Sequence, residues 1–297
     1  MASTCYYCRI APTIARSHVV PKFVGKYIKA NSPFGHMLNL WSNKPELDLH
    51  KGPYLCAKCD NETFSGWEKH FSNHVWPDPL NSRVHWTDPA TIQFFASLAY
   101  RYAIHFLETS PIPGNVPYST YMRDLAEPVI RDPTLAGSKL FIYPYVHRPI
   151  DSGYDLLPGI NHLLSLAVHG ESFPAEENLP NAMLVIIPKI TLLFCDGDLR
   201  KFSGCEIKHP VALSVSSRFL PTTSNVDLPN FLKVPLNRCI GKGQAHQKHL
   251  GRWKHLPYGT DRRANPTKVC YLAHETDTKL AKWIKLRGRS LRAISAS

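Results

Sequence analysis

Two Cys-x-x-Cys pairs, Cys5/Cys8 and Cys56/Cys59, are the residues of this chain best suited to bind a metal ion. Four thiolates in two such pairs enclose one Zn²⁺ tetrahedrally, and a closed site of this kind is structural because no coordination position stays open. The alternative is four unrelated reduced thiols, but the paired spacing favours zinc. We therefore predict one structural zinc ion that holds two loops against each other.

A histidine that could act as a base lies between the two pairs. His18 precedes Pro21 by three residues, and hydrolysis of a phosphodiester needs a base that titrates near neutral pH, as histidine does. The reaction also needs positive charge at the phosphate oxygens, which Mg²⁺ or Mn²⁺ on oxygen ligands supplies. Asp60, directly after the last cysteine, is placed to bind such an ion. The alternatives are an ordinary hydrogen-bonded histidine and an acid favoured by the helix macrodipole.

Three stretches carry a resemblance to a known family: Cys-Tyr-Tyr-Cys (5–8), Ser-His-Val-Val-Pro-Lys-Phe (17–23), and Leu-Cys-Ala-Lys-Cys-Asp (55–60) followed by Phe64, Ser65 and Glu68. They resemble the HNH, or His-Me finger, endonucleases, in particular the zinc-stapled branch with four cysteines. The resemblance covers about residues 5–75. It implies a β-hairpin and a helix, with His18 as general base and Asp60 as the ligand of a catalytic divalent ion.

Three further positions bear on this resemblance. Glu68 lies eight residues after Asp60, a little over two helical turns, so it either joins the catalytic residues or fixes the hairpin through hydrogen bonds. Many family members carry Asp or His directly before the base as a second metal ligand, where this chain has Ser17. The middle Asn of the motif has two candidates and one possible substitute: Asn39, Asn43 and His50.

Positive charge is concentrated in the last third of the chain. Residues 1–200 carry 17 Lys+Arg against 18 Asp+Glu, whereas residues 201–297 carry 18 against 5. A localised basic region is typical of proteins that bind a polyanion, most often nucleic acid. We expect DNA as this partner, with RNA as the alternative. The alternatives are a solvated face or a surface that docks on an acidic protein. The residues predicted to contact nucleic acid are Lys242, Lys248, Arg252, Trp253, Lys254, Arg262 and Arg263.

Composition indicates a globular chain, with 43% hydrophobic and 20% charged residues. No apolar run approaches the roughly 20 residues that span a bilayer, and the first residues lack the pattern of a secretion signal. We therefore expect a cytoplasmic protein without membrane contact. Reduced cysteines in that compartment favour zinc over disulfides.

The expected fold class is α+β, with a zinc-bound ββα module at residues 1–79 and a larger mixed domain at residues 80–297 that ends in the basic region. The module ends near the Trp-Pro-Asp-Pro sequence at 76–79. Apolar periodicity predicts helices, one of them interrupted by Pro128, over 55–74, 90–107, 119–131, 154–169 and 278–293. Apolar β-branched and aromatic runs predict strands over 140–146, 183–187, 190–194 and 211–215.

Other candidate residues have less specific spacing. His70 and His74 are four apart, which suits either metal chelation or one exposed helix face. Arg101 interrupts an apolar helix, so it needs an acidic partner or the surface, and it could support the catalytic residues from behind. A second zinc site has irregularly spaced candidates: Cys239, His246, His249 and Cys270.

The leading hypothesis is a metal-dependent HNH-like endonuclease. Compact nucleases of this type resemble effectors of bacterial or phage conflict systems, so the resemblance also implies an antiphage role and a regulatory protein partner. One rival is a non-catalytic zinc protein that binds nucleic acid or another protein. A third reading places an enzyme site within residues 80–297.

Overall fold

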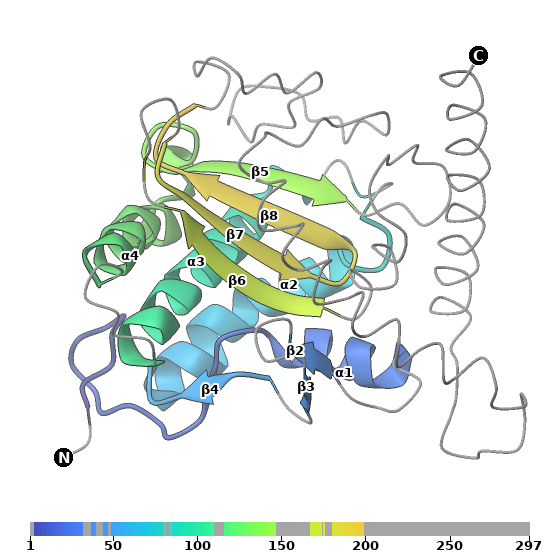
Figure 1. Ribbon diagram of the computed structural model, residues 1–297, viewed down its shortest axis with the longest axis horizontal. Coiled ribbons are helices and arrows are strands. Elements are labelled where there is room, and N and C mark those ends of the chain that lie inside the picture. The colour runs from blue at the N-terminus through green and yellow to red at the C-terminus, as the bar shows by residue number, and fades with distance from the viewer. Residues whose placement is uncertain are drawn as a thin grey trace, which may run out of the picture.

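The computed structural model describes residues 3–31, 37–39, 44–46, 49–79, 82, 85–109, 116–146, 167–173, 175 and 180–198 (Figure 1). Its helical elements are α1 (Lys22–Asn31), η1 (Cys59–Phe64), α2 (Ser65–His74), α3 (Pro89–Thr109), α4 (Val116–Arg131) and η3 (Pro133–Leu135). Its strands are β1 (Ser17–His18), β2 (Met37–Asn39), β3 (Lys44–Glu46), β4 (Lys51–Gly52), β5 (Phe141–Val146), β6 (Ala167–Phe173), β7 (Ala182–Ile187) and β8 (Ile190–Cys195). Helices and strands occur together, so the predicted α+β class is confirmed.

A six-stranded sheet in the order β3-β2-β6-β7-β8-β5 forms one layer of the fold. All pairs are antiparallel except β2 with β6, which are parallel. Every residue of β7 and β8 is buried, as the apolar runs over 183–187 and 190–194 predict. The predicted strand over 140–146 is β5, which pairs with β8 at one edge of the described sheet. An edge strand tolerates Pro144, because the N–H that proline lacks is not needed to pair with a strand on the other side.

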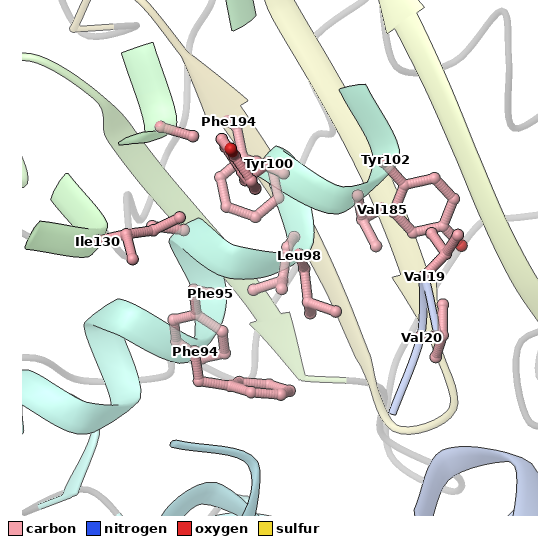
Figure 2. Packing of buried hydrophobic residues seen from close by; sticks show 14 of the residues in the cluster. Val19, Val20, Phe94, Phe95, Leu98, Tyr100, Tyr102, Ile130, Val185 and Phe194 are labelled. Atoms are coloured by element: carbon pink, nitrogen blue, oxygen red, sulfur yellow. The ribbon is translucent and has the colours of Figure 1, made fainter. Parts of the chain in front are cut away.

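Helix α3 lies in the centre of the hydrophobic core and packs against α4 and the sheet (Figures 1 and 2). It begins at Pro89, as expected from the proline at the first helical position. Its contact with β6 is close: a Cβ added to Gly170 would lie 2.4 Å from the Tyr102 ring. Gly170 therefore lets the buried aromatic ring approach the strand backbone.

Two predictions of secondary structure are wrong. Pro128 does not interrupt the helix over 119–131, because α4 continues to Arg131 with Pro128 inside. Pro128 supplies no N–H to the Asp124 carbonyl, yet the helical hydrogen bonding continues past it, because Asp132 N–H donates to the Pro128 carbonyl. Residues 167–169 belong to β6, not to a helix over 154–169, because β6 pairs with both β2 and β7. Residues 154–166 lie outside the described part.

One hydrophobic cluster runs through the described part of the chain, from the cysteine segments to the sheet. Figure 2 shows members from several elements, among them Val20, Leu98 and Val185. The cluster therefore crosses residue 79, and the division into residues 1–79 and 80–297 stays a prediction. The predicted strand at 211–215 and helix at 278–293 lie outside the described residues.

Candidate functional site around His18

The four paired cysteines lie together at the start of the fold. Each contributes a sulfur atom within 4.8 Å of the others, and the Sγ atoms of Cys8 and Cys56 are 3.8 Å apart. Tetrahedral coordination with metal–sulfur bonds of about 2.3 Å separates the sulfurs by about 3.8 Å. All four thiols are free of disulfide bonds. The cluster could therefore bind a metal ion, as the Cys-x-x-Cys spacing predicts.

Backbone hydrogen bonds form the two turns that carry these cysteines. In the first turn, Arg9 N–H donates to the Cys5 carbonyl, with Arg9 at a φ of 58°. In the second, Asp60 N–H donates to the Cys56 carbonyl as the helix begins. The two turns are joined directly, because Tyr6 N–H donates to the Tyr54 carbonyl.

Thiol acidity differs within the cluster. Backbone N–H groups of Ala11 and Ile10 lower the pKa of Cys8 to about 6, because they stabilise its thiolate. Burial, followed by hydrogen bonding and charge from the neighbouring cysteines, raises the pKa of Cys59. Closely spaced thiolates repel one another, so ionisation of one disfavours ionisation of the next. A bound cation would offset that repulsion.

His18 ends the short strand β1, which is antiparallel to β4. In this two-stranded sheet Ser17 pairs with Gly52 and His18 with Lys51, and Val19 N–H donates to the His50 carbonyl. The two strands are far apart in sequence, with α1 between them. The second cysteine turn follows shortly after β4, so the thiol cluster and His18 are connected through the same pair of strands.

Ser17 is a structural residue of this framework. Its hydroxyl is completely buried, donates to the Gly52 carbonyl at 2.7 Å, and accepts from the N–H groups of Tyr54 and Leu55 at 3.1 and 3.2 Å. Its one donor and both lone pairs are therefore used. The Ser17 hydroxyl therefore has no lone pair left for a metal ion, and its role is to fix the turn that leads into Cys56.

Replacing Ser17 by alanine is expected to destabilise the fold. Two buried N–H groups would lose their acceptor, and each unpaired group costs about 1–3 kcal/mol. Ser17→Asp should be worse, because a buried carboxylate cannot donate to the Gly52 carbonyl, and it should add no metal-dependent activity. Denaturant unfolding measures both variants. The exposed Ser138→Ala is the control, with an expected change within about 0.5 kcal/mol; equal stability of Ser17→Ala and the control would contradict this role.

Asp60 lies next to His18. The backbone N–H of His18 donates to the Asp60 carboxylate, which is half-buried at the start of η1. Burial raises the pKa of Asp60, and the charges of Arg101 and Lys22, together with the His18 N–H, partly oppose that rise. The structure thus brings together the two residues that the sequence selects as base and metal ligand.

Arg101 and Glu68 support the same strand from the core. Arg101 is 1% exposed, and its Nη1 donates to the Glu68 carboxylate at 2.7 Å and to the His18 carbonyl at 3.3 Å. Its Nε and Nη2 bond to Ser97 in the same helix, and its guanidinium lies 5.4 Å from the centre of the Phe64 ring. Glu68 therefore reaches His18 through Arg101, in line with the hydrogen-bonding role that the sequence left open.

His18 faces a basic pocket of about 570 Å³. The lining residues are Arg16, His18, Lys22, Gly25, Lys26, Lys29, Leu49 and Lys51. Five of them are Lys or Arg, and none of these described residues is acidic. A pocket with this charge attracts anions, and phosphate groups in particular, because several cationic donors converge on it.

Sequence reasoning missed the basic pocket. Lys22, Lys26 and Lys29 have the i, i+4, i+7 spacing of one helix face, and they directly follow His18. Counting charge over residues 1–200 hid them, because acidic residues elsewhere balance the sum. A search for periodic lysines beside the candidate base would have found the pocket.

The remaining predicted site residues have other positions. The ring of His50 lies against that of His105, tilted by 33° with centres 4.9 Å apart. Burial, and then the charge of His50, lower the pKa of His105 to about 4, so it is a neutral partner for the Tyr54 hydroxyl at 2.8 Å. Outside the described part lie the Asn39 side chain, Asn43, the basic C-terminal residues and the second zinc candidates Cys239, His246, His249 and Cys270.

No protein-family model, curated protein or solved structure matches this chain. Within the described residues, none of the helices has the length and apolar character needed to cross a lipid bilayer. The chemistry of the His18 pocket is therefore the main basis on which a function can be inferred.

Proposed function

We propose that the chain is an HNH-like endonuclease that hydrolyses phosphodiester bonds in DNA. The observation that carries this proposal is the position of His18: beside the Asp60 carboxylate, on the paired strands β1 and β4 that precede the second cysteine turn, and facing a pocket of five cationic side chains. The β1/β4 pair followed by the helix over 57–74 also agrees with the ββα arrangement of that family.

In this proposal each group has one task. The His18 imidazole takes a proton from the attacking water, and the pocket lysines bind and orient the phosphate. Arg101, held by Glu68, positions the His18 backbone. The base would thus lie on a strand whose backbone is held by the hydrogen bonds of Arg101 and Glu68.

The residues present also fit two metal ions. Four thiolates suit a structural Zn²⁺, which would hold the cysteine turns together. Asp60 would hold a catalytic Mg²⁺ or Mn²⁺, since such ions use one or two carboxylates with water and substrate phosphate as the other ligands. When bound, that ion would neutralise charge on the phosphate. Ser17 takes no part, because its hydroxyl is fully used.

His18→Ala is expected to reduce cleavage by about 10²–10⁴-fold, the usual contribution of a general base. Cleavage of double-stranded DNA, single-stranded DNA and RNA with Mg²⁺ or Mn²⁺ is the measurement. Zinc content and unfolding temperature should stay at the parent's values. A variant that cuts as fast as the parent would show that His18 is not the base.

The second candidate is a non-catalytic protein that binds nucleic acid, which the basic pocket alone would also support. It is favoured if the parent binds DNA but cleaves nothing with Mg²⁺, Mn²⁺ or Ni²⁺. Under either candidate function, nucleic-acid binding can be tested by comparing Lys26→Ala, in the pocket, with Lys69→Ala, an exposed lysine outside it. Loss of one phosphate contact reduces the slope of log affinity against log salt by about 0.9, and only Lys26→Ala should show it.

A further inference from the structure

Three histidines and an aspartate gather at the corner where α2 ends and α3 begins. His70 and His74 are four residues apart on α2, and His85 and Asp88 lie on the segment just before α3. The sequence indicated only the first two as possible ligands. The structure adds a third imidazole and a carboxylate from a separate segment, and the proposed nuclease chemistry uses none of the four.

The ligand atoms of this cluster already have the spacing of a coordination sphere. Asp88 Oδ2 lies 3.1 Å from His70 Nε2 and 2.9 Å from His85 Nδ1, and all three atoms are within 4.8 Å of one another. Tetrahedral Zn²⁺ with bonds of about 2.0–2.1 Å separates its ligand atoms by about 3.3 Å. Small side-chain movements would therefore accommodate the ion.

His74 provides a third imidazole, and so a fourth ligand, within reach. The centre of its ring lies 4.7 Å from that of His70 and 4.9 Å from that of His85. His74 is exposed, so its side chain can rotate without disturbing the core. Three imidazoles and one carboxylate are a ligand set that zinc uses in proteins.

The surroundings keep the cluster both ordered and accessible. The Asp88 carbonyl accepts the N–H groups of Thr91 and Ile92 at the start of α3, which fixes the backbone that carries the carboxylate. The side chains of His70, His85 and Asp88 are 26%, 37% and 32% exposed, so an ion can enter from solvent. A divalent ion would be bound through the ring nitrogens of the imidazoles.

We propose that His70, His85 and Asp88 form a second metal site, with His74 as the fourth ligand, and that its ion is Zn²⁺. The ion would connect the end of α2 to the start of α3. The site is separate from the thiol cluster and does not depend on nuclease activity.

The test is the number of zinc ions bound per full-length chain, measured by elemental analysis after dialysis at fixed free Zn²⁺. His70→Ala and His85→Ala should each bind one ion fewer than the parent or bind it at least ten-fold more weakly. The control Lys69→Ala, on the same helix, should match the parent. Cobalt substitution provides a second readout: thiolate-to-cobalt charge-transfer bands from the cysteine cluster should persist in both histidine variants.

Two outcomes would overturn the proposal. One is an unchanged zinc count and affinity in both histidine variants. The other is loss of the thiolate–cobalt bands together with the ion, because the lost ion would then belong to the cysteines. If an alanine variant unfolds, Asp88→Asn replaces it, because asparagine keeps the side-chain size but removes the charge of the carboxylate. Asp88→Asn should also bind one zinc ion fewer than the parent; an unchanged zinc count in this variant would count against the site.

Discussion

Replacement of Cys8 by alanine is expected to release one metal ion and to unfold the N-terminal part of the protein. Metal binding supplies about 10–16 kcal/mol of folding free energy in zinc-finger peptides, as much as the whole stability of an ordinary domain at about 5–15 kcal/mol. Cys8 contributes one of the four clustered sulfurs that would hold the ion between the two turns. Loss of one ligand should therefore be severe.

A matched control for this variant lies in the sheet. Cys195 is a buried cysteine of β8 outside the cluster, so Cys195→Ala removes a buried sulfur without removing a ligand. Zinc content by elemental analysis and thermal unfolding by circular dichroism compare the two. Cys195→Ala should keep the parent's zinc content, and addition of a strong chelator to the parent should reproduce the Cys8→Ala behaviour. Full zinc occupancy and parent-like stability in Cys8→Ala would refute the metal site.

Truncation of Glu68 is expected to destabilise the fold and to weaken cleavage at the same time. Removing one partner of a buried ion pair costs about 3–5 kcal/mol because the other charge stays buried and unpaired. Arg101 is 1% exposed, but Glu68 is 20% exposed, so water can compensate in part and we expect about 3 kcal/mol for Glu68→Ala. Cleavage should fall too, because Arg101 also holds the His18 carbonyl.

Two further variants separate the ion pair from general helix effects. Glu62→Ala changes an exposed acid on the same helical segment and should alter the unfolding free energy by less than about 0.5 kcal/mol. The double variant Glu68→Leu/Arg101→Leu removes both charges and should be more stable than Glu68→Ala alone. Denaturant unfolding measures all three. A Glu68→Ala protein as stable as the Glu62→Ala control would mean that the pair contributes little.

Much of the local structure could be predicted because the deciding information is local. The proline after Asp88 marks the start of α3, and the apolar runs on either side of Pro188 mark β7 and β8. The Cys-x-x-Cys spacing likewise predicts a cluster whose geometry depends on two short turns. In each case residues close in sequence determine the outcome.

The features that were missed depend on residues far apart in the chain. Residues 167–173 form a strand because β2 and β7 pair with it, which periodicity cannot reveal. The role of Ser17 depends on backbone groups of Tyr54 and Leu55, more than 35 residues away. The His85–Asp88 segment meets His70 only because α2 packs on α3.

The parallel pairing of β2 with β6 ties the segment that forms the His18 pocket to the main sheet. The segment inserted between β1 and β4 supplies the pocket lysines from α1 and also contributes β2 to the main sheet. A fragment ending at Pro79 would keep the four clustered thiols and His18 but would leave β2 without its neighbour β6 and α2 without α3. We therefore expect that residues 1–79 would fold poorly when fused to another protein, because the elements that carry the candidate site pack against elements that follow residue 79.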